Sequence, residues 1–235
     1  MTTANETISP VIPPRRRRGR ETLERLLDAT EAVIREEGIA ELTVTKVVKE
    51  ARSSVGAFYR RFPDRDALLY AVQERNHARA MHAHDAQLAK LKLENASLEE
   101  ILEALLFFRA RLVLRDAALV HAFLVKGALR SAFQDEGRRF FAGCRTTLTQ
   151  VLMSHRDLMG HPEPELALEV VCRTWLALME QVVLYGDSPF DTPVRTSDTE
   201  VLVAEYCRAM AAYLRSEGST SPHSAERTAP TDTPA

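Results

Sequence analysis

Residues 43–62 read TVTKVVKEARSSVGAFYRRF, the pattern of two short helices joined by a tight turn. The hydroxyls of Thr43 and Ser54 can each accept a hydrogen bond from a free backbone N–H at the start of a helix. Pro63 ends the second helix. Apolar residues recur at helical spacing after each cap, as Val44, Val47, Val48 and Ala51 and then as Val55, Phe58 and Phe62. A short second helix after a tight turn predicts a helix-turn-helix.

An ordinary helical hairpin would show the same apolar pattern, so charge has to separate the two interpretations. Positions 52–65 carry one acid, Asp64, against four arginines, Arg52, Arg60, Arg61 and Arg65. Tyr59 adds an aromatic hydroxyl beside them. Guanidinium and hydroxyl groups are the side chains that contact DNA phosphates. The charge therefore favours a DNA-binding helix-turn-helix.

These residues resemble the N-terminal DNA-binding domain of the TetR family of bacterial transcriptional regulators. Arg65 stands where that family usually has lysine. Arg52 takes the place of the usual turn glycine, and a left-handed non-glycine residue costs roughly 1 kcal/mol. Ser53 replaces an apolar residue under the turn. The residues that match the family pattern are Thr43, Val44, Val47, Ala51, Ser54, Gly56, Phe58, Tyr59, Phe62 and Leu68.

The resemblance implies an all-α fold with two domains. Residues 15–65 would form a three-helix DNA-binding domain with a basic arm, and residues 66–217 a larger helical domain for effector binding and dimerisation. Residues 1–14 and 218–235 would be disordered tails. The mechanism implied is that of a repressor: a homodimer occupies a palindromic operator on double-stranded DNA and is released by a small hydrophobic effector.

Composition agrees with this division. The chain has 235 residues, 45% of them hydrophobic, and only nine glycines, which favours an all-α protein with a sizeable core. Residues 1–65 carry thirteen Lys/Arg and ten Asp/Glu, which gives them a net charge of +3. Since the whole chain has a net charge of −2, the remaining residues have a net charge of −5. A basic N-terminal part on an acidic body suits one domain that faces DNA. Three well-separated cysteines, without a signal peptide or an apolar run of membrane length, predict a soluble cytoplasmic protein with reduced thiols.

Helical periodicity continues along the rest of the chain. Apolar stripes and breaks predict helices over about 21–37, 64–91, 98–114, 117–124, 131–155, 165–185 and 199–215. The last two are apolar over most of their circumference and need partners on two sides. They could be central helices of a monomer, but their position and the resemblance favour a homodimer interface.

The basic run before the first helix allows two interpretations, a solvated tail or a DNA-binding arm. Its position just before a helix-turn-helix favours the arm. Within the helix-turn-helix, Thr43 and Tyr59 match family positions that contact phosphates, and Val55, Ala57 and Arg60 should face the groove. The predicted DNA-binding residues are Arg16, Arg17, Arg18, Arg20, Thr43, Thr45, Ser54, Val55, Ala57, Tyr59, Arg60 and Arg65.

No P-loop, dinucleotide-binding glycine pattern, nucleophile elbow or HExxH motif is present, so we expect neither an enzyme nor a cofactor. His77, His82 and His84 lack the spacing of a metal site, which predicts no metal and solvated surface histidines.

Aromatic residues on the inward stripes of the C-terminal helices suggest an effector site with few polar groups. Each candidate could equally be core packing: His121 as a satisfied core histidine, and Trp175 and Met179 as core or dimer contacts. The expected ligand is aromatic or aliphatic with one hydrogen-bonding group, rather than a sugar or phosphate. The predicted lining is Phe108, His121, Phe141, Trp175 and Met179.

Two different classes of protein remain open from the sequence. One is a helical small-molecule carrier or enzyme in which residues 43–62 form a simple hairpin. The other is a constitutive DNA-binding protein without an effector. DNA binding separates the first from a regulator, and a well-formed apolar pocket counts against the second.

Overall fold

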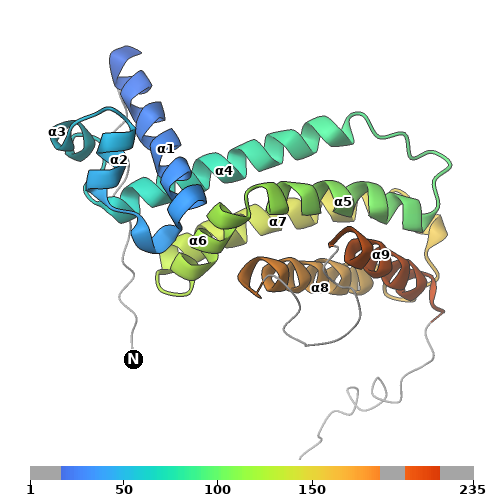
Figure 1. Ribbon diagram of the computed structural model, residues 1–235. Helices are drawn as coiled ribbons and strands as arrows, with labels where there is room; N and C mark the ends of the chain where they lie inside the picture. Colours follow the sequence, from blue (N-terminus) through green and yellow to red (C-terminus); the bar gives the residue numbers. More distant parts are fainter. Residues whose placement is uncertain (1–16, 186–198, 218–235) are drawn as a thin grey trace, which may run out of the picture.

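The computed structural model describes residues 17–185 and 199–217, and within these ranges the chain is entirely helical, which confirms the all-α prediction (Figure 1). The loop expected between 186 and 197 and both tails lie outside the described residues. The helices are α1 (Arg17–Glu37), α2 (Val44–Glu50), α3 (Val55–Tyr59), α4 (Arg65–Leu88), α5 (Leu98–Arg115), α6 (Ala117–Gly127), α7 (Ser131–Met153), α8 (Pro164–Tyr185) and α9 (Thr199–Arg215), with 3-10 turns at Ile39–Glu41 and Arg156–Leu158.

The caps predicted for the helix-turn-helix are present. The Thr43 hydroxyl accepts from the Lys46 backbone N–H at the start of α2, and the Ser54 hydroxyl accepts from Ala57 N–H at the start of α3. Arg52, in the turn between them, has a φ of 46°. The family's turn glycine is therefore replaced by an arginine that keeps the left-handed conformation.

The helix-turn-helix packs on α1 and on the first turns of α4. Leu26 of α1, Val47 of α2, Phe58 of α3 and Leu68 of α4 are all fully buried in one cluster. That cluster continues into α6 and α7 through Leu119, Phe123 and Phe133. We call α1–α3 with the start of α4 the N-terminal domain, and this shared core fixes it directly on the rest of the chain.

The remaining helices form the C-terminal domain, which has its own core (Figure 1). α5 and α9 pack closely, with Leu102, Leu105, Val203 and Cys207 buried between α5, α8 and α9. α4 runs from the N-terminal domain along the upper side of this bundle. It is thus the one helix among those described that spans the length of both domains.

The N-terminal basic run corrects one expectation. Arg17, Arg18 and Arg20 belong to the first turn of α1, which begins four residues earlier than the predicted Glu21, rather than to an extended arm. Arginine is a good helix former, and Arg17 Nε lies 2.9 Å from Glu21 Oε1, an i,i+4 pair that supports helix. No helix among the described residues has the length and apolar character needed to cross a membrane.

Candidate DNA interface and effector cavity

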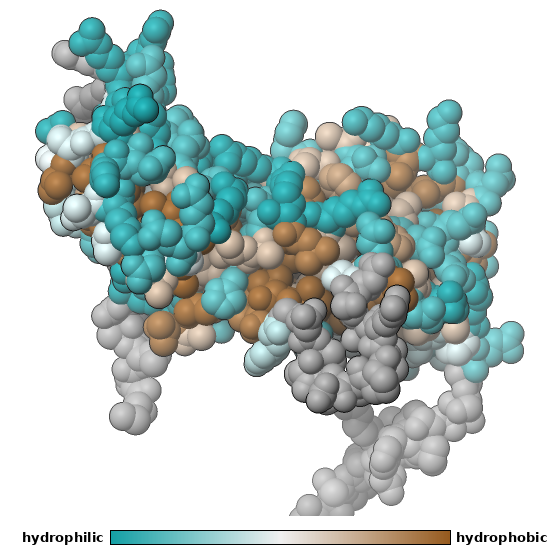
Figure 2. Space-filling model, in the orientation of Figure 1, coloured by the Kyte–Doolittle hydropathy of each residue, from teal (hydrophilic) through white to brown (hydrophobic). Residues whose placement is uncertain are grey.

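The surface of α3 is unusually apolar for an exposed helix. Val55 is 48% exposed and Tyr59 53% exposed, while Phe58, between them, is fully buried. The burial of Phe58 and Phe62 anchors the helix and fixes which face points outward. Figure 2 shows apolar atoms at the α3 end of the molecule, surrounded by hydrophilic surface. An exposed apolar stripe with a polar rim is typical of a binding face.

The predicted DNA contacts fall into two groups around that face. Tyr59, Arg60 and Ser54 are exposed on α3 or its ends, and Ala57 is half-buried. Thr43 and Thr45 are exposed at the start of α2. The two helices therefore present hydroxyl, phenol and guanidinium groups on one side of the N-terminal domain.

Arg65 is held differently from the other predicted contacts. Its Nη1 donates to the carbonyl of Leu42 at 2.9 Å, which ties the start of α4 to the residue before α2. Arg17, Arg18 and Arg20 are all exposed at the free end of α1. Arg16 lies outside the described residues.

The C-terminal domain contains a cavity of about 620 Å³. This volume is in the range of sites for drug-sized ligands. Figure 2 shows hydrophobic surface gathered in the middle of the face, where α5, α6 and α8 come together. The wall is mainly apolar, and α4, α5, α6, α7 and α8 all contribute to it, through residues that include Leu112, Val120, Phe123, Phe133, Phe140, Phe141, Leu148, Trp175, Leu176 and Met179.

The structure brings together three of the five residues predicted for this site. Phe141, Trp175 and Met179 line the cavity, whereas Phe108 and His121 do not. His121 lies about 100° around α6 from the lining residue Val120 and is only half-buried. Phe108 stacks instead on the ring of His84, with centroids 6.4 Å apart. His121 is therefore not part of the wall of this cavity.

The polar groups of the wall come from residues that sequence reasoning did not assign to a site. Gln73, Asn76, His77, Ala80 and His84 form a stripe along α4 that faces the cavity. The expectation of solvated histidines fails here, because His84 is 3% exposed. The i, i+3, i+4, i+7, i+11 spacing of this stripe was a visible signal in the sequence.

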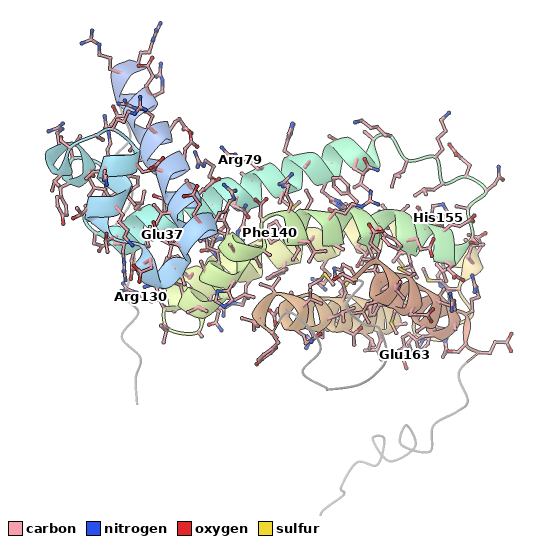
Figure 3. The ribbon with its side chains drawn as sticks, viewed as in Figure 1. Glu37, Arg79, Arg130, Phe140, His155 and Glu163 are labelled. Atoms are coloured by element: carbon pink, nitrogen blue, oxygen red, sulfur yellow. The ribbon has the colours of Figure 1, made fainter. Side chains whose placement is uncertain are left out.

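His77 has a complete set of partners. Its ring stacks on Phe140, with centroids 4.2 Å apart, and its Nδ1 lies 3.1 Å from Glu136 Oε1. Burial lowers the pKa of His77 in spite of the Glu136 carboxylate. Figure 3 shows Phe140 between α4 and the helices beneath it. His77 is thus held as part of the wall.

Cys144 and Cys172 line the cavity as free thiols. Burial raises the pKa of both thiols. They remain protonated at neutral pH and act as apolar wall. Among the described residues no group of His, Cys, Asp and Glu could hold a metal ion.

A network of ion pairs joins the cavity to the N-terminal domain. Asp116, which lines the cavity between α5 and α6, accepts a hydrogen bond from Arg35 of α1 at 2.9 Å. Burial works to raise the pKa of Asp116, but hydrogen bonds from Arg115 and Arg35 outweigh it and hold that pKa below its usual range. Arg35 also donates to Glu31, 3.0 Å away.

Glu31 continues the network to α4. Its carboxylate is almost fully buried and also accepts from Arg75 at 2.6 Å and from Arg79 at 3.0 Å. Figure 3 shows Arg79 on the side of α4 that faces the N-terminal domain. At the other end of this domain interface, Lys126 and Arg130 both donate to Asp66 in the first turn of α4, each at 3.0 Å.

Comparison with known proteins agrees with this geometry. Residues 26–72 match the family model described as bacterial regulatory proteins, tetR family. The match covers the second half of α1, all of α2 and α3, and the start of α4. The N-terminal domain of this chain is therefore a TetR-family DNA-binding domain.

Solved structures of other TetR-like chains share the whole fold. A transcriptional regulator from Rhodococcus sp. Rha1 superposes with a TM-score of 0.59 at 21% identity, covering 82% of this chain and 95% of that one. GusR of Salmonella enterica gives 0.60 at 20% identity, over 83% and 95% of the two chains. A TetR transcription regulator from Haloarcula marismortui gives 0.65 at 16% identity, over 83% and 98%. No curated protein sequence matches the chain significantly.

The match over residues 26–72 supports a helix-turn-helix transcriptional regulator. At such identities the structural neighbours support the fold alone. A shared fold does not fix which residues line the cavity or lie on the outer face of α3. The ligand and the DNA sequence therefore have to be argued from this chain's own residues.

Proposed function

We propose that this regulator is a repressor that binds a palindromic operator as a homodimer and leaves it when a small, largely apolar effector occupies the cavity. The observation that carries the proposal is the position of Asp116. Its carboxylate lies in the wall of the cavity and pairs with Arg35 on α1 of the DNA-binding domain. A ligand that displaces this wall acts on the N-terminal domain through a direct contact.

The outer faces of α8 and α9 support a homodimer. Leu166, Val170, Ala177 and Leu184 fall on one stripe of α8 at i, i+4, i+11 and i+18, and Leu166 and Leu184 are exposed. On α9, Val201 is 52% exposed. Exposed apolar stripes on two adjacent helices mark a protein–protein contact, and a two-fold axis would pair each stripe with itself.

Operator binding then depends on the spacing of two N-terminal domains. Their recognition helices have to sit about 34–36 Å apart, or a multiple of this distance, to enter successive major grooves. We propose that Thr43, Thr45, Ser54 and Tyr59 contact phosphates and that Val55, Ala57 and Arg60 face the base edges. Arg16, Arg17, Arg18, Arg20 and Arg65 would add phosphate contacts at the edges of the site.

The effector would act by preferring one arrangement of the two domains. A ligand shifts such an equilibrium only by the difference between its affinities for the two states. Contact with α4, α5 and α6 at once makes the cavity sensitive to the tilt of α4, and α4 begins in the N-terminal core. The domain division proposed from the sequence, at residue 65, then falls at the start of the helix that transmits the change.

One experiment tests the DNA and effector claims together. Selection of bound duplexes from a random pool, followed by a band shift, should return a palindromic sequence bound by two chains. Hydrophobic compounds are then screened for release of that duplex. Absence of any selected sequence would favour a helical carrier, and tight binding that no compound reverses would favour a constitutive DNA-binding protein.

A further inference from the structure

We infer that the effector cavity takes a monocarboxylate: an aliphatic or aromatic body with one carboxylate, which lies against the hydrogen-bonded pair of Arg109 and His84. The inference rests on the proposed effector function of this cavity and adds the chemical class of the ligand. It follows from three features of the cavity wall, which are the charge of Arg109, the tautomer of His84 and the pairing of the other arginines of the wall with acidic residues.

Arg109 of α5 contributes a fixed positive charge to a mainly apolar wall. Its Nη2 contacts only neutral groups, the carbonyl of Cys144 at 2.8 Å and His84 Nε2 at 2.8 Å. Its Nε is buried without a hydrogen-bond partner, and no carboxylate of the described residues forms an ion pair with it. A buried guanidinium without a counter-ion is unfavourable, and a ligand anion would supply one.

His84 places a second donor beside this charge. Because Nε2 faces an arginine N–H, it has to accept, which assigns the ring proton to Nδ1. Nδ1 is buried and has no partner among the described residues. Burial, and then the charge of Arg109, lower the pKa of His84 to about 4. The ring therefore stays neutral at physiological pH and offers one N–H.

Two donors and one positive charge match a carboxylate, which accepts through two oxygens and carries one negative charge. A phosphate would bring a second charge and a third oxygen, and the other arginines near Arg109 in the wall, Arg145 and Arg173, are already paired with Glu169. A sugar would need many more polar partners. The body of the ligand would extend along the α4 stripe from His84 toward Gln73, eleven residues or roughly 16 Å away.

Two acidic groups of the described residues line the wall; Asp116 is paired with Arg35 and Arg115, whereas Glu180 argues for a ligand of the opposite charge. Glu180 of α8 lines the cavity, and burial raises its pKa. It lies two turns along α8 from Cys172, which shares the Arg109 end of the wall. Asp85, the exposed neighbour of His84, also has an electrostatic effect on the ring. A cationic ligand is therefore the competing choice that the experiment has to include.

The test compares decanoate with 1-decanol and decylamine, and 4-phenylbutyrate with 4-phenyl-1-butanol. Binding to the full chain is followed by tryptophan emission, since Trp175 is the only tryptophan and lines the cavity. We expect each carboxylate to bind about tenfold more tightly than its alcohol, a difference of about 1.4 kcal/mol. Equal affinity of acid and alcohol, tighter binding of the amine, or no binding of any compound would overturn the inference.

Variants locate the carboxylate. Arg109→Met should weaken decanoate about tenfold and leave decanol unchanged, and Arg109→Lys should recover part of the loss. Arg111→Met, an exposed position on the same helix, is the matched control and should bind like wild type. A damaged fold would lower acid and alcohol affinities together, so the split between the two is the diagnostic result. If Arg109→Met and Arg109→Lys each lost decanoate and decanol affinity to the same extent, the placement of the carboxylate beside Arg109 would be wrong.

These binding measurements do not depend on DNA. If decanoate binds through Arg109 but leaves the selected operator occupied, the ligand class stands and the proposed release mechanism fails. If the operator is released by neutral compounds alone, the proposed function stands and the carboxylate assignment fails.

Discussion

Arg35 Nη2 and Asp116 Oδ1 lie 2.9 Å apart, although 81 positions separate the two residues in the chain. The contact joins the last turns of α1 to the junction of α5 and α6. Asp116 also accepts two hydrogen bonds from Arg115, and Arg35 shares Glu31 with Arg75 and Arg79 of α4. One chain of charged groups therefore runs from the cavity wall through α1 to α4.

We expect Asp116→Asn to weaken the coupling between the effector cavity and DNA binding. The variant removes a negative charge that holds Arg35, but Arg35 is partly exposed, so the free energy of unfolding should fall by only about 1–2 kcal/mol. Operator affinity without effector should change little, while the factor by which effector lowers it should shrink.

A double-mutant cycle with Arg35→Gln measures the contribution of the pair itself. Glu205→Gln, which removes an exposed i,i+3 partner of Arg208 on α9, is the control. Effector responses that stay at the wild-type factor in both single variants would show that the pair is not part of the transmission.

Tyr59→Phe and Arg60→Ala should weaken operator binding without changing the fold. Both side chains are exposed on α3, so neither contributes to the buried core. Loss of one phenolic hydrogen bond should cost about 0.5–1.5 kcal/mol, and loss of a guanidinium contact to a base about 1–3 kcal/mol. Band shifts give the affinities, and thermal unfolding checks the fold. Lys92→Ala, far from α3, is the control and should bind the operator with wild-type affinity. Wild-type affinity in both α3 variants would show that Tyr59 and Arg60 do not contact DNA.

The arginines at the start of α1 should govern the salt dependence of binding. Each phosphate contact that is lost should reduce the slope of log K against log salt by about 0.9. Replacing Arg17, Arg18 and Arg20 by Gln keeps the helix and removes the charge. The slope is measured between low and moderate salt on operator and on random DNA. A slope equal to that of wild type would mean that this turn of α1 lies away from the phosphates.

Leu184→Glu and Val201→Glu should each convert the dimer to a monomer. Both side chains are exposed, so the change adds charge to the proposed interface without opening the core. Light scattering at micromolar concentration reports the mass. Leu129→Glu, at a 75% exposed position between α6 and α7, is the control and should remain dimeric. A wild-type monomer, or unchanged dimers in both variants, would contradict the assignment of this face.

Acid should destabilise the protein partly through His84. The unfolded histidine titrates near 6.5 and the folded one at about 4, so the unfolded state binds more protons between these values. The free energy of unfolding is therefore complete above pH 6.5 and falls as the pH drops toward 4, by up to roughly 3 kcal/mol. His77, whose pKa is also lowered by burial, acts in the same direction.

Urea unfolding of wild type and His84→Gln at several pH values separates this contribution. Glutamine can still accept from Arg109 but does not titrate, so its stability should vary less between pH 7 and pH 4.5. His82→Gln, an exposed neighbour on α4, should follow the wild-type curve. Parallel curves for wild type and His84→Gln would show that the ring is not buried as a neutral group.

The sequence alone determined the helical fold and the helix-turn-helix. Thr43 and Ser54 cap their helices as expected, because a cap depends on a hydroxyl and a backbone N–H three residues away. Apolar stripes repeat within one helix and are visible in the local pattern. The turn geometry at Arg52 did not follow from the sequence, because arginine replaces the usual glycine there, and only the structure shows its left-handed φ of 46°.

Only the tertiary structure decided which side chains meet in the cavity. The sequence marks His121 as the one polar residue between Ala117 and Val125, but the rotation of α6 against α5 and α8 places Val120 and Leu124 in the wall instead. His84 and Arg109 come from helices that only the packing of α4 on α5 and α7 brings within 2.8 Å. Helical periodicity is a local property, whereas the rotation and offset of one helix on another depend on how both cores fill space, and that information is spread over residues far apart in the chain.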